Sequence, residues 1–350
     1  MFKKILIVVL TISLLGAAAG CGTSAPDSAP SGGASGDATG AASAQPTADT
    51  AKITVTEVRV ATQPGVYAAS ILLAKVNGYL EEELKDSGVK VKWNSFLSGP
   101  PMNEAFAAGE EDIGLVGDVP LLIAKASGQP TLVFAKNSSG ETTVALTVKP
   151  GSPIQSPADL KGKKIAFVKG SYGHHFLSLV LNKGGLTLKD IEQVNLPNAD
   201  IGNAVASGDV DAGVIWEPTL TSSLTGNIVA ELIDATGLKS NSVYFFVTES
   251  FAKDNPGILQ AYIRAVDKAA KFIRENPDKA AEQLQGEIAL KPEELSKLLL
   301  KFDFSPLLSD TDNAELKQVE EFNRAQGFTT GTVDVDTFVD TQYLENSGIK

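Results

Sequence analysis

The chain has 350 residues, 43% of them hydrophobic, and a formal net charge of −12 at pH 7. A chain of this length buries a large core and exceeds the usual size of one domain, so we expect more than one folded unit. An acidic surface argues against nucleic acid or anionic lipid as a partner, because both require basic patches. Composition therefore excludes the nucleic-acid-binding class.

The N-terminal segment has the pattern of an export signal. Lys3 and Lys4 form a positive segment, an apolar run covers residues 5–15, and small residues lead to Cys21, the only cysteine in the chain. This pattern resembles a bacterial lipoprotein signal, in which residues 1–20 are removed and the cysteine thiol is lipidated. The apolar run is too short to remain as a membrane-spanning helix. We expect an extracytoplasmic protein that its lipid anchors to the cell membrane, at the outer face or in the periplasm. An ordinary secretory signal with a chance cysteine is the alternative.

The next segment lacks the side chains that a core requires. Residues 22–50 contain no Val, Ile, Leu, Met or aromatic residue. Such a segment cannot bury enough apolar surface to fold, so residues 21–51 are predicted to be a flexible tether with a reach of roughly 30 Å. Residues 52–350 then form the folded body. Lipidation of Cys21 leaves this body without a thiol, which excludes disulfides and cysteine-based metal sites, and we expect neither a metal nor a cofactor.

Short β-like runs alternate with amphipathic helical stretches in the body. This alternation is typical of α/β lobes with largely parallel sheets. From about residue 249 the chain reads as nearly all helix, with Pro256, Pro277 and Pro292 at first-turn positions. The candidate strands are 57–62, 89–96, 112–116, 131–137, 143–149, 164–168, 192–196, 211–215 and 243–248, and the candidate helices include 67–77, 101–109, 174–184, 200–207 and 256–275.

Two segments of the body follow one plan. Residues 103–117 and residues 203–215 each read as a helix that closes on Gly, then an acidic turn, then a buried strand. We therefore expect one lobe to repeat the plan of the other. Two such lobes place a ligand crevice between the carboxyl ends of their strands, where helices begin, and this geometry favours an anion.

Four strand-to-helix turns combine Gly or Pro with a small polar residue. They are residues 62–65, 98–101, 117–120 and 169–175. Such turns leave backbone N–H groups unpaired, with the positive end of a helix dipole behind them. A single turn of this kind is typical of a simple N-cap, whereas four of them in one chain indicate an anion site.

Longer runs carry a family resemblance. GYLEEEL at 78–84, FLSGPPMNEAFAAGEEDIGLVGDVP at 96–120, SPADLKGKKIAFVKGSYGHHFL at 156–177 and GDVDAGVIWEP at 208–218 stand in a familiar order and spacing. They resemble the substrate-binding proteins of ABC importers for aliphatic sulfonates, taurine and nitrate, and the resemblance covers most of residues 55–260. It implies an α/β fold of the two-lobe type II periplasmic-binding class, with two hinge crossovers and a helical C-terminal portion.

The resemblance also implies a division of the body. It places lobe one at residues 52–141 plus 246–350 and lobe two at residues 142–245, with the crossovers near 140–143 and 244–246. The closed form is expected to deliver its ligand to a permease subunit in the membrane. The ATPase is expected to be a separate cytoplasmic subunit, since this chain has no G-x-x-x-x-G-K-[ST] loop.

The expected ligand is a small organic anion of the sulfonate type. A sulfonate is ionised at any biological pH and offers three acceptor oxygens, so a ring of neutral donors suits it. None of the four arginines lies in the turns, which argues against a bidentate guanidinium clamp, and Arg59 in mid-strand is the one that would change this interpretation. Carried over by motif, the expected ligand contacts are Gln63, Ser98, Gly99, Gly117, Asp118, Ser171, Tyr172, His174 and Trp216.

Several of these residues have a structural alternative. Trp216 either packs against the aliphatic part of a ligand or belongs to the core. Asp118 either caps the following helix or holds the ammonium of an amino-sulfonate such as taurine. Glu217 is a second candidate for that ammonium but is expected to face solvent. His174 is interpreted as an anion donor and His175 as a packing residue. The two cannot easily share a metal, because neighbouring side chains on a helix diverge by about 100°.

Other functions stay open on the sequence. A tethered hydrolase needs a nucleophile elbow such as G-x-S-x-G, which the body lacks, and Ser171 with His174 at i and i+3 is typical of capping. A binding protein for nitrate or for a thiamine-type pyrimidine uses a related fold. The pyrimidine calls for several cleft aromatics, for which Trp216 and Tyr172 are the candidates. We predict a binding protein and not an enzyme.

Overall fold

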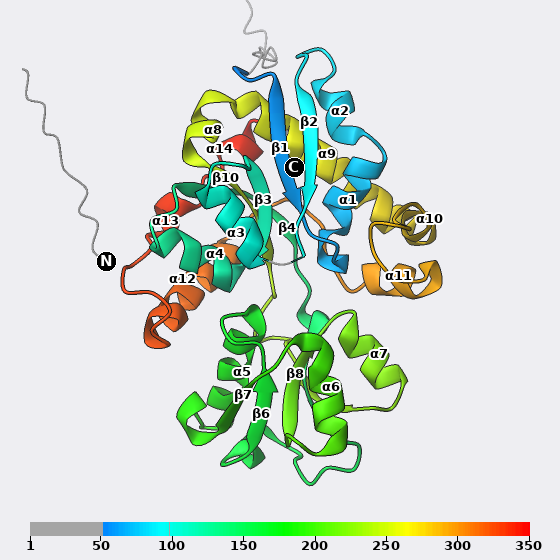
Figure 1. The fold of residues 1–350 in the computed structure, drawn as a ribbon, viewed down its shortest axis with the longest axis vertical. Coiled ribbons are helices and arrows are strands. Elements are labelled where there is room, and N and C mark those ends of the chain that lie inside the picture. The colour runs from blue at the N-terminus through cyan, green and yellow to red at the C-terminus, as the bar shows by residue number, and fades with distance from the viewer. Residues whose placement is uncertain (1–51, 98) are drawn as a thin grey trace, which may run out of the picture. The chain divides into compact units, whose positions relative to one another are not determined.

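Two five-stranded sheets organise the protein in a computed structural model that describes residues 52–97 and 99–350 (Figure 1). The first sheet contains β1 (Glu57–Thr62), β2 (Lys90–Ser95), β3 (Ile113–Gly117), β4 (Thr131–Ser138) and β10 (Val243–Thr248), and the second contains β5 (Val144–Val148), β6 (Lys164–Phe167), β7 (Glu192–Asn195), β8 (Ala212–Trp216) and β9 (Ala230–Asp234). The strand orders are β2-β1-β3-β10-β4 and β7-β6-β8-β5-β9. The expected signal at 1–20, the tether at 21–51 with Cys21, and Ser98 lie outside the described residues.

The two sheets have the same plan. In each, three neighbouring strands run parallel, and the fourth strand in the order, β10 or β5, is antiparallel to both of its neighbours. The antiparallel strand is the one by which the chain enters that sheet from the other. Residues 139–143 lead into β5, and residues 235–242 lead into β10. This confirms the two-lobe α/β fold with two crossovers. The two sheets also share one plan, as the similar segments 103–117 and 203–215 predicted.

The second crossover lies earlier in the chain than the sequence suggests. We expected it near residues 244–246, but Val243–Thr248 pairs along its length with β3 and β4. The apolar run in this strand is long enough to span the sheet of lobe one, so the connection is made by the polar residues before it. Residues 243–245, which we expected in lobe two, therefore belong to the sheet of lobe one.

Helices cover the faces of both sheets. Three of them start at the predicted prolines, because the first turn of a helix does not use the N–H that proline lacks. Within the described part of the chain, no helix has the combined length and hydropathy needed to cross a membrane. The helices are α1 (Ala69–Val76), α2 (Tyr79–Leu84), α3 (Gly99–Ala107), α4 (Asp118–Ala126), α5 (Tyr172–Lys183), α6 (Asn198–Ser207), α7 (Thr219–Thr225), α8 (Glu249–Asp254), α9 (Pro256–Glu275), α10 (Pro277–Gln283), α11 (Pro292–Leu299), α12 (Asp310–Ala325), α13 (Val335–Phe338) and α14 (Gln342–Glu345).

Both crossing strands are buried on two faces. In β10, Val243, Phe245 and Val247 face a core formed with α1, α2 and α9, whereas Tyr244 and Phe246 face a second core on the other side. Alternate residues of a strand point to opposite faces, so a strand that is apolar at every position suits the interior of a sheet covered on both sides. Strand β5 alternates in the same way between that second core and a third core under α6 and α7. The second core contains residues of both sheets, among them Val116, Leu146, Ile165, Val214 and Phe246.

Gly140 packs closely in the first crossover. A Cβ at this position would lie 2.6 Å from the carbonyl oxygen of Lys301 and 2.5 Å from Cγ2 of Thr143. Backbone yields little to such a contact, so we expect Gly140→Ala to lower the free energy of unfolding by about 1–3 kcal/mol. Gly331→Ala is the matched control, because its added Cβ would lie 3.9 Å from the nearest atom, the oxygen of Ala126. Urea unfolding of both variants provides the measurement, and equal midpoints would contradict the prediction.

Candidate ligand-binding site

Strand ends from both lobes meet in the structure. A Cβ placed on Gly117, the last residue of β3, would lie 3.5 Å from Cδ1 of Tyr172, the first residue of α5. The Tyr172 ring also lies 5.1 Å, centroid to centroid, from the ring of Trp216, which ends β8. Three of the expected ligand contacts are thus brought together from two lobes. The region around these three residues, at the strand ends of both lobes, is called the crevice below.

Tyr172 is a neutral hydroxyl group within reach of charges from both lobes. Burial raises the pKa of Tyr172 well above its usual value, and the neighbouring Tyr67, Asp118 and Glu217 raise it further. The phenol therefore keeps its proton at any biological pH. It can donate a hydrogen bond to an anion without a change in its own charge.

Ser171 caps α5. Its Oγ accepts a hydrogen bond from the His174 N–H at 3.3 Å and donates one to the Val168 carbonyl at 2.7 Å. The hydroxyl proton is thus engaged with the backbone, which is the capping alternative that the sequence left open. The first N–H groups of the helix, those of Tyr172 and Gly173, have no partner one turn earlier in the helix. They make the N-terminus of α5 the anion-attracting element beside the two aromatic rings.

Gln63 is buried and holds its own turn. Its Nε2 donates to the Leu115 carbonyl at 3.1 Å, and its Oε1 accepts from the Tyr67 hydroxyl at 2.8 Å. Burial raises the pKa of Tyr67 to about 12, so this phenol is also neutral. In this structure the Gln63 amide is engaged in hydrogen bonds that position Tyr67 in the first lobe, and its role as a ligand donor stays a prediction.

His174 lies in aromatic surroundings. Its ring stacks on Phe167 at 4.5 Å between centroids and meets Phe322 edge-on at 5.1 Å. The Gly170 N–H donates to Nδ1 at 3.3 Å, which assigns the proton of the neutral ring to Nε2. That Nε2 atom is buried and has no partner among the described residues. Burial, with a smaller effect from Lys169, lowers the pKa of His174 to about 4.

His175 has the packing role that the sequence suggested. Its side chain is buried, and its ring lies 4.9 Å from that of Phe322 on α12. Burial lowers the pKa of His175 well below its usual value, and the charge of Lys239 lowers it further. Across the described ranges, no three His, Cys, Asp or Glu side chains are grouped so that they could hold a metal ion.

Asp118 is paired with a lysine from the second crossover. Its Oδ1 accepts from the Val119 N–H at 2.7 Å, and its Oδ2 accepts from the ammonium of Lys239. The Asp118 side chain is 2% exposed and that of Lys239 is 1% exposed, so both charges are removed from water. The sequence allowed a cap or an ammonium site at Asp118, and the structure shows a carboxylate that contacts its own helix and an ammonium of this chain.

Glu217 is also paired with a lysine. Its Oε1 accepts from Lys301 Nζ at 2.5 Å and from Thr221 Oγ1 at 2.8 Å, and the Glu217 side chain is only 1% exposed. The expectation that Glu217 faces solvent is therefore wrong. The physical reason is that the segment after α11 brings a cation against it, and buried carboxylates require such a partner.

One further expected residue, Gly99, and the backbone of Trp216 also lie at element ends beside the crevice. Gly99 begins α3, where an added Cβ would lie 3.2 Å from Cγ2 of Val116. Trp216 is half-buried, and its backbone N–H donates to Oδ1 of Asn198 at 3.1 Å. Asn198 also donates to the Trp216 carbonyl at 3.3 Å, so the first residue of α6 fixes the end of β8. Asn198 was missed by the sequence analysis, although it opens a helix just after a strand.

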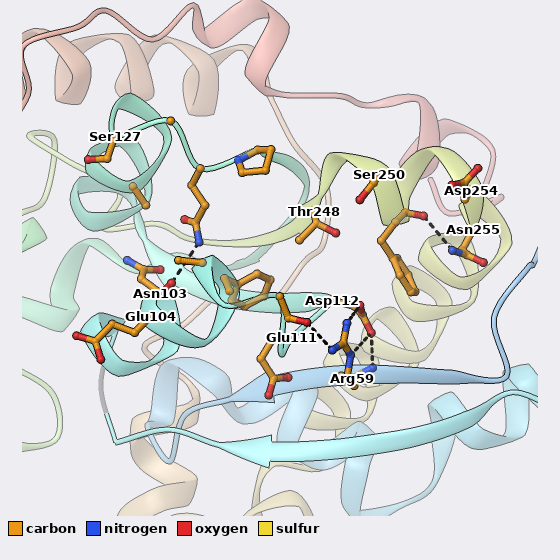
Figure 2. A pocket seen from close by; sticks show the side chains of 18 of the residues that line it. Arg59, Asn103, Glu104, Glu111, Asp112, Ser127, Thr248, Ser250, Asp254 and Asn255 are labelled. Atoms are coloured by element: carbon orange, nitrogen blue, oxygen red, sulfur yellow. Dashed lines mark hydrogen bonds and ion pairs between the residues drawn. The ribbon is translucent and has the colours of Figure 1, made fainter. Parts of the chain in front are cut away.

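A large cavity in lobe one lies away from the crevice and has a different lining. Figure 2 shows this cavity, of about 940 Å³, lined by Arg59, Asp112 and residues that precede β1, β3 and β4. It therefore lies at the amino ends of the parallel strands, opposite the crevice. Arg59 binds Asp112 through Nε at 3.0 Å and Nη2 at 2.5 Å. Because the guanidinium is neutralised there, it supplies no clamp for an anion at the strands' other ends.

Two α/β lobes of one plan, two crossovers and strand ends of both lobes that meet at Gly117, Tyr172 and Trp216 are the architecture of a binding protein of the periplasmic type. Residues 66–280 match the family model described as NMT1/THI5 like, and the chain belongs to that family. A putative aliphatic sulfonates-binding protein of Escherichia coli K12 is 32% identical over 227 residues, which are 65% of this chain and 70% of that protein. The taurine-binding periplasmic protein of the same strain is 32% identical over 236 residues, 66% of this chain and 70% of that protein. The crystal structure of the periplasmic aliphatic sulphonate binding protein from Escherichia coli has a TM-score of 0.75 at 27% identity and covers 82% of this chain and 93% of that one.

The burial of His174 predicts a pH dependence of stability. Its pKa is about 4 in the folded protein, against an ordinary value of 6.5. Between these values the unfolded chain binds more protons than the folded chain, so stability falls as the pH is lowered from about 6.5 towards about 4. We expect His174→Phe, which suits the aromatic surroundings, to reduce the slope by about 1.4 kcal/mol per pH unit. Urea unfolding of both proteins across this range is the measurement. An unchanged slope would show that the folded protein binds this proton as readily as the unfolded chain.

Proposed function

We propose that this protein is the substrate-binding component of an ABC importer and captures a small organic sulfonate in the crevice. The observation that carries the proposal is the meeting of Gly117, Tyr172 and Trp216 at strand ends of both lobes. Two relatives of the chain are named for binding aliphatic sulfonates and taurine, which supports the same ligand class.

The crevice has two kinds of contact for such a ligand. The N-terminus of α5 and the neutral Tyr172 hydroxyl supply donors for the sulfonate oxygens. The rings of Tyr172 and Trp216 supply an apolar wall for the aliphatic part. The other expected contacts, Gln63, Ser171 and His174, support this site indirectly, since they hold the surrounding turns and the start of α5.

The proposed function includes a location of the protein outside the cytoplasm and a sequence of steps in transport. The signal pattern that ends at Cys21 supports export and lipid attachment, and residues 21–51 would tether the body near the membrane. An open form exchanges ligand, closure adds contacts from the second lobe, and the closed form docks on a permease whose ATPase is a separate subunit.

The same contacts argue that the protein is a carrier and not an enzyme. The Ser171 hydroxyl donates to the Val168 carbonyl, so its proton is not directed at a base. The His174 Nδ1 accepts from the Gly170 N–H and the ring is packed among aromatics. A nucleophile needs a base within hydrogen-bond reach, and these two side chains are engaged elsewhere.

Thermal unfolding with a panel of anions tests the proposal. The panel is 1-propanesulfonate, taurine, isethionate, sulfate, nitrate and a thiamine-type pyrimidine. A sulfonate at a hundred times its dissociation constant adds about 2.7 kcal/mol, which raises the midpoint by a few degrees. Sulfate and nitrate should leave the midpoint unchanged. A rise with the pyrimidine or nitrate alone would contradict the proposed ligand class.

The two tryptophans of the chain offer a matched test of the site. Trp216→Ala removes one of the two rings of the apolar wall, so we expect sulfonate binding to weaken by about 1–2 kcal/mol. Trp93→Ala is the control, because this indole lies on β2 and donates to Glu81 of α2 at 2.8 Å. Titration calorimetry measures both affinities. An equal loss in the two variants would assign the effect to general destabilisation and remove Trp216 from the site.

A further inference from the structure

Two buried carboxylates beside the crevice residues have charges that are balanced from within the chain. Asp118 is paired with Lys239, and Glu217 is paired with Lys301. Both lysines come from segments at the crossovers. Lys239 lies in the connection 235–242, and the carbonyl of Lys301 abuts Gly140 in the other connection.

Both carboxylates lie next to residues of the crevice in the chain. Asp118 directly follows Gly117, against which the Tyr172 ring lies, and Glu217 directly follows Trp216, whose ring packs on Tyr172 at 5.1 Å. The negative charges of Asp118 and Glu217 also both raise the pKa of Tyr172, so both carboxylates lie near enough to the phenol to act on it. A ligand that contacts Tyr172 is therefore exposed to the charge balance of both ion pairs.

An ammonium group on a ligand needs a carboxylate that is not already neutralised. A second cation beside a buried ammonium meets like-charge repulsion and loses its hydration. The sulfonate end of the same ligand does not need the two paired ammonium groups, because the α5 N-terminus and the Tyr172 hydroxyl supply its donors. An uncharged far end meets the rings of Tyr172 and Trp216, which need no counter-charge.

We propose that Lys239 and Lys301 determine specificity by acting as internal counter-ions that exclude ligands with an ammonium group. This inference rests on the proposed function and narrows its ligand to alkanesulfonates without an amino group, so that taurine is rejected. Sequence reasoning treated Asp118 and Glu217 as candidate ammonium sites, and the two lysines fill those positions.

Two ligands of equal length test the inference on the full-length protein. 1-Propanesulfonate and taurine differ only in a methyl group against an ammonium group. Titration calorimetry should give 1-propanesulfonate an affinity at least about tenfold higher. Equal affinities, or tighter taurine binding, would overturn the inference and leave the proposed function in place. If neither ligand binds, the proposed function fails and the inference fails with it.

A substitution at Lys301 tests the mechanism. Lys301→Met leaves Glu217 without its cation, so the affinity for taurine relative to 1-propanesulfonate should rise by about tenfold. The Lys301 side chain is 33% exposed, which allows the replacement without a cavity. Lys297→Met, on the exposed side of α11, is the control and should leave the ratio unchanged. The double variant Glu217→Gln with Lys301→Met removes both charges and should return the ratio to that of the wild type. A ratio that Lys301→Met does not change would overturn the counter-ion role.

Discussion

The insertion of one antiparallel strand into each sheet is the constraint on which the arrangement depends. Strand β10 pairs with β3 and β4, and β5 pairs with β8 and β9, each in the sense opposite to its neighbours. An inserted strand begins at the edge where its parallel neighbours end. The connections 139–143 and 235–242 must therefore lie at the carboxyl ends of the parallel strands. Crossovers and strand-to-helix turns share one edge for this reason, and any ligand held by the turns lies beside the crossovers.

The same constraint explains the electrostatics of the crevice. Asp118 and Glu217 follow strands that end at this edge, in places where water is excluded. A buried carboxylate is stable only with a partner, and the elements that adjoin it are the crossovers and the segment packed on them. Lys239 and Lys301 come from those elements. The lysines that balance these carboxylates thus belong to, or pack on, the connections between the two lobes.

The local pattern of the sequence explains which parts of the structure could be predicted from it. The bounds of β1, β10 and α9 agree with the expected 57–62, 243–248 and 256–275, because each has an uninterrupted period and a clear start. Strand β9 was missed, since a short edge strand with Glu231 and Asp234 among its five residues has a weak apolar signal. Among residues of the proposed site, motifs pointed to the glycine and aromatics that the structure brings together at strand ends. The lysines were not, because their partners lie 121 and 84 residues away in the chain.

The chain has a formal charge of −12, so the proposed binding of an anion requires short-range attraction to exceed long-range repulsion. At physiological ionic strength the field of exposed carboxylates decays over about 8 Å, so distant surface charge has little effect in the crevice. The groups proposed to act there are the α5 N-terminus and the neutral phenols, in surroundings of low dielectric constant. His174 contributes no charge, since its pKa is about 4. The proposed anion is therefore held by groups whose charge is constant at biological pH, which suits a sulfonate, because its own charge is constant as well.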